Sequence, residues 1–158
     1  KNQGIVGRSD GGNTIHHQHG YNFKYTNLQA AIVLNQIKSL NRRVSRLKRH
    51  YKIYKHNLNN LKKVKVFNFD ISNGEFPLWT DIWCEKRDQL HSYLIEKKID
   101  CRKFWYPLHT QKPFKANNKD FKNSKKIFKN LLWLPSALKL QDSDILRVCT
   151  SIKNFYKK

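Results

Sequence analysis

Two short segments of the sequence combine aromatic rings with an amide or imidazole and with a cation. Residues 20–27 read GYNFKYTN, and residues 102–109 read RKFWYPLH. Aromatic rings stack on planar or apolar ligands, while amides, imidazoles and cations hold anionic groups by hydrogen bonds and charge. The same residue types also pack inside ordinary proteins, so composition alone leaves ligand binding and simple packing open for both segments.

Three histidines stand close together near the start of the sequence, at His16, His17 and His19. Metal sites need ligands that converge from ordered elements, and this spacing in a Gly-flanked segment gives no such frame. We interpret these histidines as polar loop residues and predict no metal site.

The three cysteines are Cys84, Cys101 and Cys149, and they are scattered singly without a CxxC pair. An odd number of isolated cysteines argues against a disulfide scaffold or a zinc ribbon and favours a reducing compartment. We interpret them as small buried hydrophobic residues.

A long helix is expected to follow the first aromatic segment. Thr26 and Gln29 have the T-x-x-Q spacing of a capping box. Residues 28–34 are apolar on nearly every side, so we expect this part to be buried on more than one side. Apolar residues then recur at intervals of three and four as far as Leu61. The pattern predicts one helix over 27–61, about 50 Å long, that packs on a sheet, although its heptad spacing also fits a two-stranded coiled coil.

The remaining sequence has the pattern of a small α+β domain. A small antiparallel or mixed sheet with helices packed on one face accommodates the expected order of elements. We predict strands at 63–66, 76–84 and 99–105, helices at 86–98, after Ser124 and at 142–156, and a corner at 133–136.

The chain is strongly basic, with 32 Lys and Arg against 11 Asp and Glu and a formal net charge of +21. Such a charge attracts nucleic acid, but 24 of the basic residues are Lys, and bidentate recognition of bases and phosphates favours Arg. We therefore expect any nucleic-acid binding to be non-specific. One function that the charge leaves open is a non-catalytic basic module that binds nucleic acid or a partner chain through the long helix.

No run of the sequence approaches the roughly 18 apolar residues that a membrane span needs, so we predict no membrane insertion. The sequence also contains no Met and begins at Lys1, which leads us to expect a piece of a longer protein.

The two aromatic segments belong to a wider set of ordered motifs. Residues 2–4 (NQG) and 20–31 (GYNFKYTNLQAA) resemble the NQG…GYNYRMTNxQAA signature of the DegT/StrS nucleotide-sugar aminotransferases, in particular of perosamine synthases. Arg102 with residues 106–109 resembles the R…YPLH segment of that family. Further along, residues 134–136 resemble its LPS corner and 142–155 its last helix, so the resemblance covers nearly the whole chain.

The resemblance implies an α/β fold, namely the C-terminal small α+β domain and connecting helix of a fold-type-I enzyme that uses pyridoxal 5'-phosphate (PLP). It divides the chain into an active-site loop segment (1–26), the connecting helix (27–61) and the small domain (62–158). The large domain that binds PLP through a Schiff-base lysine would lie outside this chain, so we expect the chain alone to be inactive and to retain no PLP. The complete enzyme would transfer an amino group, typically from glutamate, to a 4-keto or less often a 3-keto nucleotide sugar for surface polysaccharide synthesis.

The resemblance also implies a cytoplasmic homodimer with active sites at the subunit interface. By analogy with the family motif, Asn22 would contact the PLP phosphate of the neighbouring subunit. Lys24 stands where the family usually has Arg. The lysine keeps the positive charge but cannot form the paired hydrogen bonds of a guanidinium group. The residues expected to bind substrate are Tyr21, Lys24, Arg102, Tyr106 and His109.

Overall fold

The computed structural model describes residues 25–110 and 118–157. The chain divides into two compact units, residues 1–40 and 41–158, each of which is described by itself. The boundary between these units falls inside the helix expected over 27–61, and the three-part division made from the sequence stays a prediction.

The described part of the first unit is helix α1 (Asn27–Lys38) with its cap. The predicted capping box is confirmed, because Thr26 Oγ1 accepts the Gln29 amide at 3.2 Å and Gln29 Oε1 accepts the Thr26 amide at 2.9 Å. No residue of α1 is buried. The burial expected for residues 28–34 is therefore not found in this chain.

The prediction of one continuous helix over 27–61 is wrong. Helix α1 ends at Lys38, and a second helix, α2, runs over Leu40–Leu58. Between them, the amide and the hydroxyl of Ser39 both donate to the carbonyl of Gln36, at 3.1 and 3.0 Å. A serine hydroxyl that competes for backbone carbonyls favours a helix end, and the apolar spacing on either side concealed this signal.

The second unit contains a four-stranded antiparallel sheet with the strand order β1-β2-β4-β3. Asp81 of β2 and Arg102 of β3 both lie opposite Trp133 of β4, on its two sides. The strands are β1 (Val64–Val66), β2 (Thr80–Cys84), β3 (Arg102–Lys103) and β4 (Leu131–Leu134).

Strand β4 was missed in the sequence, where residues 133–136 are read as a corner. All four of its side chains are buried, so it has no alternation of apolar and polar residues to reveal a strand. The expected strands at 76–84 and 99–105 are both shorter in the structure. Pro77 lies in the first of these segments and cannot donate a backbone hydrogen bond to a sheet, and the second leaves the sheet after Lys103.

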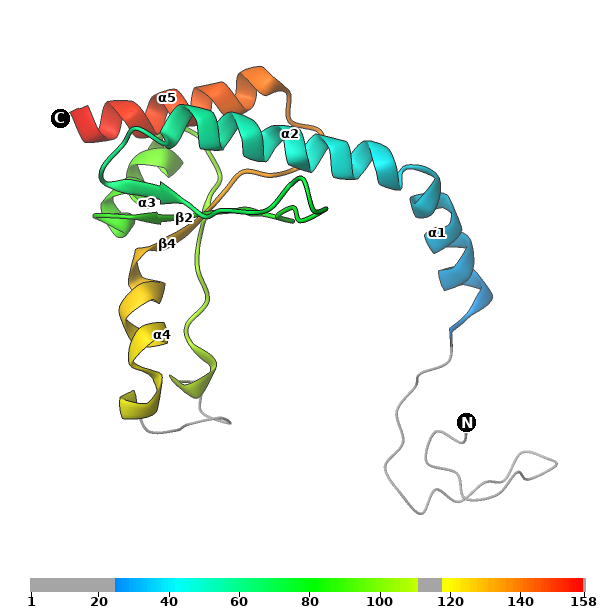
Figure 1. Cartoon of the computed structure of the whole chain (residues 1–158), viewed down its shortest axis with the longest axis horizontal. Helices are drawn as coiled ribbons and strands as arrows, with labels where there is room; N and C mark the ends of the chain where they lie inside the picture. Colours follow the sequence, from blue (N-terminus) through cyan, green and yellow to red (C-terminus); the bar gives the residue numbers. More distant parts are fainter. Residues whose placement is uncertain (1–24, 111–117, 158) are drawn as a thin grey trace, which may run out of the picture. The chain divides into compact units, whose positions relative to one another are not determined.

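Helices α2 and α5 lie side by side on one face of the sheet (Figure 1). They run in the same direction, because Arg49 pairs with Asp142 near the start of α5 and Asn57 contacts Lys153 further along it. The predicted helices at 86–98, after Ser124 and at 142–156 correspond to α3 (Arg87–Glu96), α4 (Lys122–Ile127) and α5 (Asp142–Lys157). Short 3-10 turns occur at η1 (Leu108–Thr110), η3 (Asn118–Phe121) and η4 (Phe128–Asn130).

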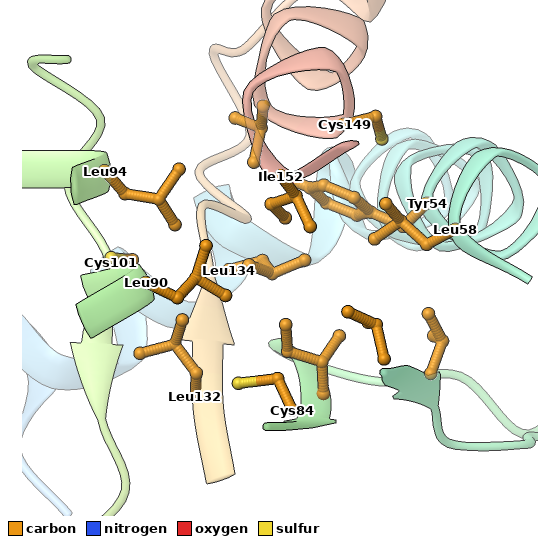
Figure 2. Packing of buried hydrophobic residues seen from close by; sticks show 14 of the residues in the cluster. Tyr54, Leu58, Cys84, Leu90, Leu94, Cys101, Leu132, Leu134, Cys149 and Ile152 are labelled. Carbon is orange, nitrogen blue, oxygen red and sulfur yellow. The ribbon is translucent and has the colours of Figure 1, made fainter. Parts of the chain in front are cut away.

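The hydrophobic core lies between this helical layer and the sheet, as Figure 2 shows. Its fully buried side chains come from α2, α3, α5 and the two central strands, and they include Tyr54, Leu58, Ile82, Leu90, Leu94, Leu132, Ile145 and Ile152. The expected fold class, helices packed on a small antiparallel sheet, is confirmed. Among the described residues, no helix is both long and apolar enough to span a membrane.

Candidate substrate-binding site

The RKFWYPLH segment begins in the sheet and then leaves it. Arg102 and Lys103 form the edge strand β3, and the Phe104 amide still donates to the Leu131 carbonyl at 3.3 Å. The chain then turns into η1, where the amide and the hydroxyl of Thr110 donate to the Pro107 carbonyl at 2.9 and 2.7 Å. The segment thus projects beyond the edge of the sheet as an ordered turn.

A cavity of about 730 Å³ lies between this segment and helix α4. About half of its lining residues are aromatic, and Tyr106, His109 and Ser124 are among those with polar side-chain groups. The lining residues are Phe104, Trp105, Tyr106, Pro107, Leu108, His109, Phe121, Ser124, Ile127, Phe128 and Leu131.

His109 forms part of the cavity wall and is only 7% exposed. Its ring stacks on that of Phe121, with centroids 4.5 Å apart and planes 13° from parallel. Its Nε2 atom is buried and has no hydrogen-bond partner among the described residues. A buried polar atom usually has a partner, so this nitrogen is a candidate contact for a ligand.

The structure separates two of the other predicted substrate residues. Tyr106 lines the same cavity as His109, is 70% exposed and lies against Phe128, with ring centroids 5.6 Å apart. Arg102 instead lines a second hollow of about 690 Å³, together with residues that include Trp79 and Trp133. Tyr106 and His109 are therefore brought together, and Arg102 faces a neighbouring space.

Trp133 lies at the centre of an aromatic cluster beside these two hollows. Trp79 stacks on it at 5.1 Å, Trp105 meets it edge-on at 4.4 Å, and Phe104 does so at 5.6 Å. Trp105 lines both hollows. These contacts pack Phe104 and Trp105, two of the residues that line the cavity, against Trp133.

Asp81 is an acidic residue that the sequence analysis did not single out. It lies half-buried on β2 opposite Trp133, and its Oδ1 atom has no hydrogen-bond partner within the described part of the chain. Burial raises the pKa of its carboxyl to about 6. The only signal for it in the sequence is a charged residue inside the apolar alternation of residues 80–84.

Helix α4 and the turn that follows it carry four lysines, none of which lines the cavity. Lys122, Lys125, Lys126 and Lys129 are all exposed on these elements, which also contribute Ser124 and the neighbouring apolar residues to the cavity wall. A cluster of exposed ammonium groups attracts anions such as phosphates. Positions 122, 125, 126 and 129 fall on the opposite side of the helix from the cavity-lining positions 124, 127 and 128, so these lysines make the outer face of α4 basic and not the cavity wall.

The cysteines are buried and free, in agreement with their interpretation as small hydrophobic residues. Burial raises the thiol pKa values of Cys84 and Cys101 to about 12 and that of Cys149 to about 11. Thiols with such high pKa values are poor nucleophiles near neutral pH. No group of three or more potential metal ligands occurs among the described residues.

The remaining candidates from the sequence lie outside the described residues. These are Tyr21, Asn22 and Lys24 of the first aromatic segment, and the three histidines at 16, 17 and 19.

Comparison with known proteins identifies a family over nearly the whole chain. The model of the DegT/DnrJ/EryC1/StrS aminotransferase family matches residues 1–153. A GDP-perosamine synthase of Escherichia coli O157:H7 is 28% identical over 92% of this chain and 42% of its own length. A GDP-perosamine synthase of Vibrio cholerae is 31% identical over 99% of this chain and 43% of its own length. The chain thus spans less than half the length of these relatives.

Several solved structures have a similar fold. DesV of S. venezuelae superposes with a TM-score of 0.77 at 21% identity, over 91% of this chain and 40% of its own. Sugar aminotransferase CalS13 of Micromonospora echinospora superposes with a TM-score of 0.75 at 15% identity, over 96% of this chain and 42% of its own. Spr1654 of Streptococcus pneumoniae, in its PLP form, superposes with a TM-score of 0.79 at 15% identity, over 98% of this chain and 41% of its own. At these identities the likeness establishes the fold alone.

Proposed function

Because this chain belongs to the DegT/DnrJ/EryC1/StrS aminotransferase family, we propose that it is the C-terminal part of an enzyme that aminates a keto nucleotide sugar. The names of the two curated relatives point to a GDP-linked sugar as the substrate. We propose glutamate as the amino donor, a 4-keto group as the acceptor and a cytoplasmic homodimer as the working form. The product would serve surface polysaccharide synthesis.

The observation that carries this proposal is the aromatic cavity formed by the family-like segment 102–109. Its rings offer flat apolar surfaces, and the buried Nε2 of His109 and the phenol of Tyr106 offer polar contacts. Pockets of this kind, mostly apolar with a few placed polar groups, bind small organic ligands. In the proposed enzyme, His109 and Tyr106 contact the nucleotide sugar and orient it.

The lining residues of the cavity do not themselves form a PLP site. They include no lysine for a Schiff base and no carboxylate for the ring nitrogen of the cofactor. PLP, when bound, supplies the electron-accepting ring that amino transfer requires. In our proposal those cofactor contacts lie in another part of the complete enzyme, and this chain contributes the phosphate contact of Asn22. We expect this chain alone to retain no PLP.

We propose further that, in the complete enzyme, the Asn22 amide donates to the PLP phosphate of the neighbouring subunit and that Lys24 and Tyr21 contact the nucleotide sugar. Arg102, which faces the hollow beside Trp133, would contact another part of the same substrate.

The proposal is tested with the complete enzyme, by mass-spectrometric detection of the amino sugar formed from a GDP-linked 4-keto sugar and glutamate. PLP affinity is measured in parallel by absorbance titration. Asn22→Ala should weaken PLP binding about ten- to a hundredfold, because one charge-assisted hydrogen bond contributes about 1.5–3 kcal/mol. Lys24→Arg is the matched control and should leave both PLP affinity and amino transfer nearly unchanged, since Arg keeps the charge.

An enzyme that is saturated with PLP but forms no amino sugar from any keto nucleotide sugar would contradict the proposed function. Wild-type PLP affinity in Asn22→Ala would contradict only the assignment of Asn22. The two failures are therefore distinguishable.

A further inference from the structure

A second charged feature lies apart from the aromatic cavity, at the start of helix α2. Arg42, Arg43 and Arg46 line a hollow of about 480 Å³ together with Leu138 and Lys139 of the loop that precedes α5. We call it the arginine hollow. Four of its five lining residues are cationic and none is acidic.

One guanidinium of the arginine hollow is held in a fixed position. Nη2 of Arg46 donates to the Leu140 carbonyl at 2.6 Å and to Oε1 of Gln141 at 3.0 Å. No other hydrogen bond or ion pair of Arg46 is formed with the described residues, which leaves Nε and Nη1 available as donors. A guanidinium fixed at one end presents its other donors with little loss of side-chain entropy.

Asp142 and Asp144, the nearby acidic residues, each have a partner through Oδ2, while Oδ1 of Asp142 is buried with no hydrogen-bond partner among the described residues. The Asp142 carboxylate pairs with Arg49, whose Nε lies 2.7 Å from Oδ2, and Oδ2 of Asp144 accepts the Gln141 amide at 2.8 Å. Asp142 is near enough to lower the positive potential in part, but it is not among the residues that line the hollow.

His50 does not change this balance. It is fully buried, with Nε2 3.2 Å from the Leu140 carbonyl. Burial lowers its pKa, and the charges of Arg46 and Arg49 lower it further, against the opposing effects of the Leu140 carbonyl and Asp142. His50 therefore stays neutral near pH 7 and adds no charge to the site.

Cations that share one hollow repel each other unless an anion lies between them. Guanidinium groups bind phosphate oxygens through paired hydrogen bonds, whereas a lysine contributes a point charge. We propose that the arginine hollow binds a small anion with two linked phosphoryl groups, as in inorganic pyrophosphate or in the diphosphate part of a nucleotide. Arg42, Arg46 and Lys139 are its principal ligands. This site is separate from the aromatic cavity and does not depend on the proposed aminotransferase activity.

The test is calorimetric titration of the 158-residue chain with inorganic pyrophosphate in 150 mM NaCl, where weak long-range attraction is largely screened. The double variant Arg42→Gln/Lys139→Gln should bind pyrophosphate at least tenfold more weakly than the wild type. It leaves the contacts of Arg46 with the loop intact. The matched control is Lys52→Gln/Lys62→Gln, which removes the same charge from two exposed positions that do not line the hollow; its affinity should change less than twofold.

Equal losses of pyrophosphate affinity in the two double variants would overturn the proposal. It would also be overturned if the wild type bound no pyrophosphate at millimolar concentration. Titration with GDP distinguishes the sources of the diphosphate. Tighter binding of GDP than of pyrophosphate, lost in Arg42→Gln/Lys139→Gln, supports a nucleotide-borne group, and tighter binding of pyrophosphate supports the free anion. A short DNA duplex that displaces pyrophosphate at a lower concentration than GDP does would instead indicate a nucleic-acid surface and overturn the assignment to a small anion.

Discussion

Two polar side chains beside the aromatic cluster bury an atom that finds no partner in the described part of the chain. In His109 the atom is Nε2, and in Asp81 it is Oδ1. An unpartnered buried polar atom costs about 1–3 kcal/mol. Such a cost is tolerated most readily where a ligand or another part of the protein supplies the missing partner, which fits the position of His109 in the cavity wall.

Substitution of Asp81 tests this free-energy cost in the chain without a ligand. Because burial raises its pKa to about 6, the folded state holds a proton that the unfolded state has lost between about pH 4 and pH 6. The contribution of Asp81 to stability therefore falls as pH rises through this range and is constant above it. Asp81→Asn should remove this pH dependence and raise the free energy of unfolding at pH 8 by about 1 kcal/mol, a value reduced because the side chain is half exposed.

The measurement is urea unfolding of wild type and Asp81→Asn at pH 5 and pH 8. Asp100→Asn, a neutralising change at an exposed position, is the control. An Asp81→Asn protein that is less stable than wild type at pH 8 would show that the carboxylate has a favourable partner.

The sequence indicated His109 and Tyr106 because they stand in a recognisable segment beside aromatic residues. It could not indicate Asp81, since nothing in the chain order reveals that Asp81 lies opposite Trp133 in the sheet. It also did not reveal that Arg102 faces a different hollow from His109, because that depends on where the edge strand ends.

At the level of helices and strands, the sequence predicted correctly the features that depend on residues close together in the chain. The capping box of α1 occurs as expected, since it depends on two residues three positions apart. The helix break at Ser39 depends on a side-chain hydroxyl that competes for a backbone carbonyl. Strand β4 depends on the burial of side chains on both faces of the sheet. Neither effect has a clear periodic pattern in the sequence.

The central position of β4 in the sheet leads us to predict how far substitutions in it lower the free energy of unfolding. Leu132 is fully buried, whereas Leu34 of α1 is 61% exposed. Leu132→Ala should lower the free energy of unfolding by about 2–5 kcal/mol, because it leaves a cavity in the core. Leu34→Ala should change it by about 0.5 kcal/mol or less. Chemical denaturation of the two variants checks this, and similar losses in both would contradict the observed burial.

At the level of the whole chain, α1 presents an apolar surface that is left exposed in the described part of its own unit. Leu28 is 73% exposed, Ile32 55% and Leu34 61%. These side chains lie on more than one side of the helix, and extensive exposed apolar surface usually marks an interface. We expect the 158-residue chain to self-associate at micromolar concentration despite its net charge of +21.

Sedimentation velocity tests this expectation. Leu28→Lys/Leu34→Lys should shift the chain towards monomer, and Asn35→Lys/Gln36→Lys, which adds the same charge at polar positions of the same helix, should shift it less. A wild-type chain that sediments as a monomer and binds no hydrophobic dye would contradict the expectation.

The proposed function requires the aromatic cavity to be the substrate site of an aminotransferase, and the two half-reactions of the complete enzyme test this most directly. Amino transfer from glutamate to the enzyme and from the enzyme to the keto nucleotide sugar can be followed separately by stopped-flow absorbance in wild type, His109→Ala and His109→Gln. We predict that both variants keep PLP binding and the glutamate half-reaction, while His109→Ala lowers the rate or affinity of the sugar half-reaction at least tenfold and His109→Gln lowers it less. Loss of PLP binding, or an equal loss in both half-reactions by an enzyme that remains folded, would contradict the assignment of this cavity to the sugar substrate.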